Sequence, residues 1–98
     1  MAIKRVKWNR DLGWRPVADV CSRRGFAVEI GFNPLQESEY RWCVHFAGSG
    51  QYFQTVGEAI DYCVSRKWCK EETAGALIRK CCAAAEILTA DKGVCDER

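Results

Sequence analysis

Two runs of alternating apolar residues constrain the fold of this chain more than any other feature. Phe26–Phe32 has a large apolar residue at every second position, and Tyr40–Phe46 repeats the pattern. Since successive side chains of a β-strand point to opposite faces of the sheet, each run predicts a strand with one buried face. Gln51–Thr55 predicts a third strand after the flexible Gly48-Ser49-Gly50 connection, so the three segments together predict an antiparallel meander.

The segment before these strands has the end signals of a helix. Pro16 suits the opening turn of a helix, and Arg23 and Arg24 place positive charge near its C-terminal end. Gly25 stands where helices commonly stop. We therefore predict a first helix from Pro16 to Gly25, and its apolar face would carry Val17, Val20 and Cys21.

Two further helices are predicted after the strands. Thr55-Val56-Gly57-Glu58 fits a capping box, in which the threonine and glutamate side chains satisfy free amides at a helix start, so a helix is expected from there to about Lys67. Apolar residues at three- and four-residue steps predict another helix from Glu71 to about Ala90. The chain is therefore predicted to be α+β, a three-stranded antiparallel meander with helices on one face, in the order αβββαα.

Length and composition predict one globular domain. The 98 residues are 48% hydrophobic and 29% charged, and no apolar run approaches the roughly 20 residues that cross a membrane. We divide the chain into a basic arm, residues 1–13, and a single domain, residues 14–98. The polar N-terminus lacks the apolar core of a secretory signal, so a cytoplasmic location is expected.

The seven cysteines are predicted to be reduced thiols that mostly act as small core residues, because their number is odd and the expected compartment is reducing. Cys43 and His45 share one predicted sheet face, where Glu29 could orient the imidazole of a thiolate–imidazole dyad or a helix cysteine could complete a zinc site. The chain has no CxxC pair, which structural zinc sites normally use. We therefore predict no catalytic, cofactor or metal site.

Two regions are predicted to contact a partner. The basic arm combines Lys4, Arg5, Lys7 and Arg10 with Trp8, a mixture that proteins use to follow a phosphate backbone and stack on bases. The sheet face opposite the helices has no predicted cover and is mixed in polarity, which suits a protein interface. The residues predicted to contribute from this face are Glu29, Arg41, His45, Tyr52 and Gln54.

The predicted helix–three strands–helix order over Pro16 to Lys67 resembles the double-stranded-RNA-binding domain. That family grips phosphates with a lysine cluster at the start of the helix after the third strand. At the matching position this chain has Val56-Gly57-Glu58-Ala59, followed by Asp61. Negative charge at a helix start repels phosphate, so the resemblance lies in the predicted order of elements and not in the phosphate-binding residues.

These features favour a small non-enzymatic binding protein that occupies the surface of a partner protein. In size, in its single predicted domain and in lacking a catalytic motif, the chain resembles inhibitors carried by bacteriophages and mobile elements, including anti-CRISPR proteins. The alternative is a nucleic-acid-binding regulator that uses the basic arm. The net charge of +2 favours the protein-binding interpretation, because dedicated nucleic-acid-binding domains are more often strongly basic.

Overall fold

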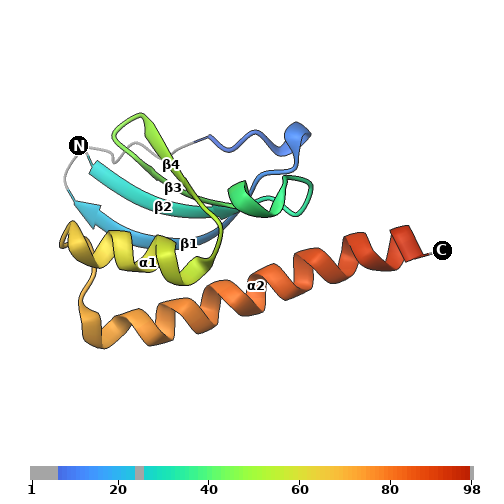
Figure 1. Ribbon diagram of the computed structural model, residues 1–98. Coiled ribbons are helices and arrows are strands. Elements are labelled where there is room, and N and C mark those ends of the chain that lie inside the picture. The colour runs from blue at the N-terminus through green and yellow to red at the C-terminus, as the bar shows by residue number, and fades with distance from the viewer. Residues whose placement is uncertain (1–6, 24–25, 98) are drawn as a thin grey trace.

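The fold is built on a curved antiparallel sheet with both helices on one face (Figure 1). The computed structural model describes residues 7–23 and 26–97. Over these residues the sheet has four strands in the order β1-β2-β3-β4, and the α-helices α1 and α2 follow. The strands are β1 (Arg15–Arg23), β2 (Phe26–Phe32), β3 (Trp42–Phe46) and β4 (Ser49–Phe53). The α+β class is confirmed, but the order is ββββαα.

Strand β1 occupies the segment that was predicted to form the first helix, so that prediction is wrong. Pro16 pairs with Gly31 of β2 and Ala18 pairs with Ile30, so Val17 between them has no partner residue on β2. Val20, between Asp19 and Cys21, has no partner residue for the same reason. These two β-bulges, three residues apart, give the strand an apolar spacing that imitates a helix. Pro16 is tolerated because β1 lies at the edge of the sheet, where an amide can be missing.

The other strands lie close to their predicted positions. The run Phe26–Phe32 coincides with β2. Strand β3 begins at Trp42, later than predicted, because Ser38–Tyr40 forms the short 3-10 helix η2. Strand β4 begins at Ser49, two residues before the predicted start at Gln51.

Both predicted helices after the sheet are present. Helix α1 (Val56–Ser65) begins at the predicted cap, where the Thr55 hydroxyl accepts a hydrogen bond of 3.2 Å from the Glu58 amide. Helix α2 (Glu71–Glu97) continues beyond the predicted end near Ala90, since a single glycine, Gly93, does not stop it. With a strand in place of the first predicted helix, the element order of the double-stranded-RNA-binding domain is not present.

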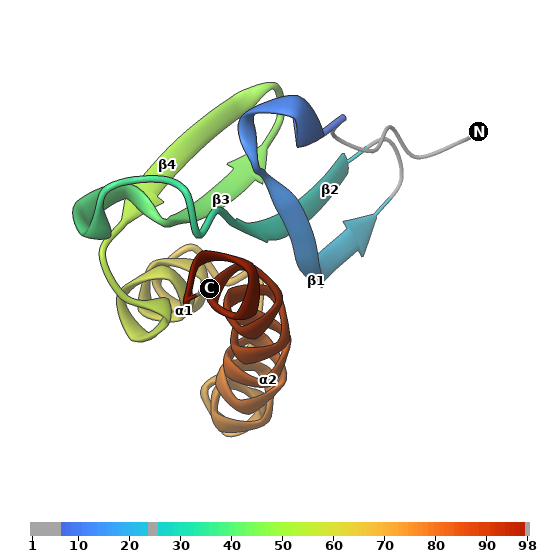
Figure 2. The same cartoon turned by 90° about the vertical axis from the view of Figure 1, so that its right-hand side faces the viewer.

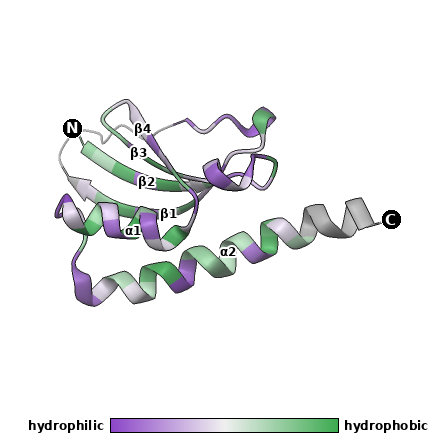
Figure 3. Ribbon diagram, in the orientation of Figure 1, coloured by the Kyte–Doolittle hydropathy of each residue, from purple (hydrophilic) through white to green (hydrophobic). Residues whose placement is uncertain are grey.

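The helices and one sheet face enclose the core. Helix α1 covers β3 and β4, whereas α2 packs against β1 and α1 and extends past the sheet (Figures 1 and 2). Hydrophobic and hydrophilic residues are interspersed along α1 and along the coloured part of α2 (Figure 3), and the buried residues of α1 recur at three- and four-residue steps, as expected for a helix with one buried face. The fully buried core side chains include Val28, Ile30, Val44, Ile60 and Cys63. The opposite sheet face is therefore the one left for a site.

Candidate partner-binding surface

The segment before β1 crosses the sheet face opposite the helices. Trp8 lies directly against Gly31: a methyl group added at Gly31 would come within 2.6 Å of the Trp8 ring. The Trp8 indole N–H donates a 3.1 Å hydrogen bond to the Glu29 carboxylate, and its ring lies 5.6 Å from the His45 ring. Neither α1 nor α2 covers this face, as predicted, but Trp8 covers part of it. Glu29 is consequently only 5% exposed.

Trp8 begins a row of rings that crosses the sheet. Trp14 lies 5.9 Å from Trp8 and 5.8 Å from Tyr52, between ring centroids, and Tyr52 meets Tyr40 edge to face at 6.5 Å. The rings differ in exposure: Trp14 is 8% exposed, whereas Tyr52 is 54% and Tyr40 51% exposed. The tryptophans are thus part of the packed structure, while the two tyrosines remain available to a partner.

A buried asparagine fixes the turn that carries Trp14. Asn33 is fully buried, and its side-chain amide donates to the Leu12 carbonyl at 2.9 Å while its side-chain oxygen accepts from the Leu35 amide at 2.9 Å. Gly13 has a positive φ of 100°, and a methyl group there would approach the Asn33 oxygen to 2.5 Å. The 3-10 turn η1 (Arg10–Leu12) is therefore held against the β2–β3 connection.

The residues predicted to contact a partner do not all lie on one surface. Glu29, His45 and Tyr52 share the face opposite the helices, as predicted. Lys7, Arg10, Arg41 and Gln54 are exposed, and Gln54 lies just beyond β4. The Arg41 guanidinium donates to the Gln36 carbonyl at 2.9 Å, which fixes it beside the β2–β3 connection. Lys4 and Arg5 lie outside the described residues.

Burial is the main cause of the pKa shifts of both Cys43 and His45. Burial raises the pKa of the Cys43 thiol to about 11, although a hydrogen bond with the Gln51 backbone opposes the shift. Burial also lowers the pKa of His45, against the effect of the Glu29 charge. A protonated thiol is a poor nucleophile and a poor metal ligand. Among the described residues, no group of three or more His, Cys, Asp or Glu is arranged to hold a metal ion.

The β2–β3 connection places exposed apolar side chains beside two other segments: Tyr40 meets the Tyr52 ring at 6.5 Å, and Leu35 lies beside Gly13, which follows Leu12. The described residues include five large apolar side chains that are strongly exposed, and Leu12, Leu35, Tyr40 and Tyr52 are four of them. We call these four, together with Arg41, the aromatic end. Tyr40 was predicted to face the core, but η2 turns it outward. Leu12 and Leu35 were missed, although an apolar residue beside Gly13 or Pro34, within a turn, was a usable signal.

Comparison with known proteins places no constraint on this surface, since no family model, curated protein or solved structure matches the chain. None of the described helices is long and apolar enough to span a membrane.

Proposed function

We propose that this protein is a non-enzymatic binding protein that acts by occupying the surface of a partner protein through the aromatic end. The observation that carries the proposal is that Leu12, Leu35, Tyr40 and Tyr52 are each more than half exposed, with Tyr40 and Tyr52 in ring contact at 6.5 Å. Tyrosine and arginine are enriched among the residues that dominate binding energy at protein interfaces, and contiguous exposed apolar side chains mark such interfaces. Arg41, already held by the Gln36 carbonyl, would lose little freedom on binding.

A nucleic-acid-binding regulator is the second candidate, because Lys7 and Arg10 are exposed at the start of the chain. Base stacking requires free aromatic ring faces. Trp14 is 8% exposed, and Trp8 packs on Gly31 and donates to Glu29. These internal uses of the tryptophans favour the protein-binding proposal. Within it, inhibitors carried by bacteriophages and mobile elements, anti-CRISPR proteins among them, remain the class that the size of the chain suggests.

The test is affinity capture with the full chain from a lysate of the encoding organism, with and without nuclease, quantified by mass spectrometry. Tyr52→Ser should lower the recovery of the partner at least about tenfold, since interface tyrosines can contribute more than 1.4 kcal/mol. Gln51→Ser is the matched control, because Gln51 is exposed on the same strand but points to the other face. Equal recovery with both variants, or loss of the partner on nuclease treatment, would contradict the proposal.

A further inference from the structure

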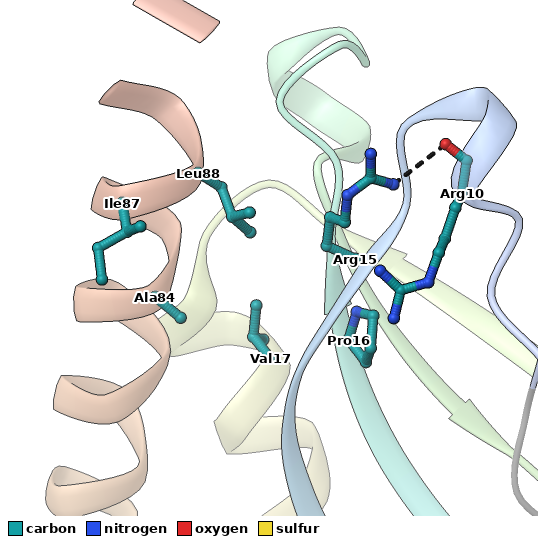
Figure 4. A pocket seen from close by; sticks show the side chains of 7 residues that line it. All are labelled: Arg10, Arg15, Pro16, Val17, Ala84, Ile87 and Leu88. Atoms are coloured by element: carbon teal, nitrogen blue, oxygen red, sulfur yellow. Dashed lines mark hydrogen bonds between the residues drawn. The ribbon is translucent and has the colours of Figure 1, made fainter. Parts of the chain in front are cut away.

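A groove lies between the start of β1 and the middle of α2 (Figure 4). Its volume is about 310 Å³. Val17 faces Ala84 and Leu88 across the groove, so its walls are apolar, and two arginines approach from η1 and β1. The lining residues are Arg10, Arg15, Pro16, Val17, Ala84, Ile87 and Leu88.

The two arginines give the groove a fixed positive charge. One terminal nitrogen of Arg15 donates to the Arg10 carbonyl at 3.0 Å and to the Trp14 carbonyl at 2.9 Å, which holds the guanidinium in place and leaves its other N–H groups available. Arg10 is exposed. Within the described part of the chain, neither guanidinium forms an ion pair with a carboxylate.

The groove continues toward the aromatic end. A second hollow of about 290 Å³ shares Arg10, Arg15 and Leu88 with it and reaches Leu35. Asp11 lines this second hollow but not the first, so the first hollow has the larger excess of positive charge in its lining. Leu35 of the aromatic end therefore borders the hollow that joins the groove.

We propose that this groove binds a segment of the partner protein in which a leucine-like side chain stands next to aspartate or glutamate. The apolar side chain would lie between Val17 and Leu88, and the carboxylate would pair with Arg15 and Arg10. A guanidinium with free N–H groups matches a carboxylate, and 310 Å³ is at the small end of ligand sites, which suits one or two side chains better than a cofactor. This inference rests on the proposed function, since it names the chemistry of the same partner.

The test uses the ¹⁵N-labelled full chain and the synthetic peptide acetyl-Glu-Glu-Leu-Leu-Glu-Glu-amide. Saturable NMR shifts are expected at the amides of Val17, Ala84 and Leu88. The peptide with lysine in place of glutamate, and the peptide with glycine in place of leucine, should each bind at least about tenfold more weakly. Arg15→Gln should weaken the binding of the acidic peptide by about tenfold. Arg79→Gln, which removes an equal charge from an exposed position on α2, should leave binding unchanged.

Three results of the peptide titrations would overturn the inference. They are the absence of saturable shifts at about 5 mM acidic peptide, equal binding of the lysine peptide or the glycine peptide, and binding that Arg15→Gln does not weaken. Shifts at the groove that depend on protein concentration alone would show that a second copy fills it, and would also overturn the inference. Failure of the proposed function would look different, because Tyr52→Ser would then leave partner capture unchanged whatever the peptide does.

Discussion

Three thiols are used as buried apolar side chains. Burial raises the pKa of Cys43 to about 11, of Cys63 to about 12 and of Cys81 to about 11, and nearby thiols add to the shift at Cys63. The reactive form of cysteine is the thiolate, so these groups are unreactive at ordinary pH. Cys63 and Cys81 belong to the core between the sheet and the helices, and Cys21 and Cys69 pack against it, which matches the prediction that most cysteines serve as core residues. Cys43 is buried on the opposite sheet face.

Alkylation of the native protein tests this use of the thiols. With iodoacetamide at pH 8, Cys82, which is exposed, should react first, while Cys43, Cys63 and Cys81 should react only after unfolding in urea. Peptide mass spectrometry with and without urea measures the alkylation rate of each of these four cysteines. Modification of Cys63 in the native protein as fast as Cys82 would show that the core opens locally or that the thiol is not buried.

His45 should make the stability of the fold depend on pH. Burial lowers its pKa in the folded state below the ordinary value of 6.5, although the Glu29 charge acts in the opposite direction. As pH falls below about 6.5, the unfolded chain takes up the proton first, so the free energy of unfolding decreases until the folded-state pKa is passed.

Urea unfolding of the wild type and of His45→Gln at pH 7.5, 6.5 and 5.5 isolates this effect, because the other titrating groups are common to both proteins. The stability of the wild type relative to the variant should decline across the series. A relative stability that rises toward pH 5.5 would mean that pairing with Glu29 outweighs burial and that the pKa of His45 is raised in the folded state.

At the scale of elements, local signals predicted most of the elements and the antiparallel meander of β2, β3 and β4, but not the pairing of β1 with β2. The alternation in β2 and β3 and the cap at Thr55 depend on neighbouring residues, so they can be recognised in the sequence. The bulges at Val17 and Val20 depend on the register between β1 and β2, which a local pattern does not contain. A strand was therefore mistaken for a helix, and the sheet was predicted with three strands instead of four.

In the candidate site too, the features that depend on local alternation were predicted, and the contact between distant segments was not. Alternation correctly put Glu29, His45 and Tyr52 on one face, but the packing of Trp8 across 21 residues onto Glu29 could not be derived from it. Gly31 was the available signal, since a glycine inside a strand often marks the close approach of another group. Its position against the Trp8 ring fits that rule.

A double-mutant cycle tests the contact between the arm and the sheet. Gly31→Ala should destabilise the wild type by about 1–3 kcal/mol, because the added methyl group must displace the Trp8 ring. In a Trp8→Ala background the same change should cost less than about 0.5 kcal/mol, since the ring is gone and alanine suits a strand better than glycine. Equal costs in both backgrounds, measured by urea unfolding, would show that Trp8 does not rest on Gly31.

At the scale of the whole molecule, one short turn links the two surfaces that we propose for the partner. Turn η1 contributes Leu12 to the aromatic end and Arg10 to the groove, and Asn33 holds this turn against the β2–β3 connection. Both surfaces are therefore attached to the same anchored turn. A partner that contacts both gains from this preorganisation, because little conformational freedom is lost on binding.

The basic arm should affect the rate of partner binding more than its lifetime. Neutralising Lys4, Arg5 and Lys7 to Gln leaves both proposed contact surfaces intact, and it should change stability by less than about 1 kcal/mol because Lys7 is exposed. With a protein partner, association should slow at low salt and recover at high salt, whereas dissociation should stay constant. Tyr52→Ser should show the reverse, with faster dissociation at both salt concentrations.

Surface plasmon resonance of the captured partner at about 50 and 200 mM salt would measure both rate constants. With a nucleic-acid partner, the arm variant should instead reduce the slope of log affinity against log salt by nearly one unit for each phosphate that the arm no longer neutralises. We expect the behaviour described for a protein partner. Trp8 and Trp14 pack against the rest of the structure, so the arm has exposed charge but little exposed aromatic surface. An unchanged dissociation rate in Tyr52→Ser would remove the aromatic end from the interface, since a buried interface tyrosine cannot be replaced by serine without shortening the lifetime of the complex.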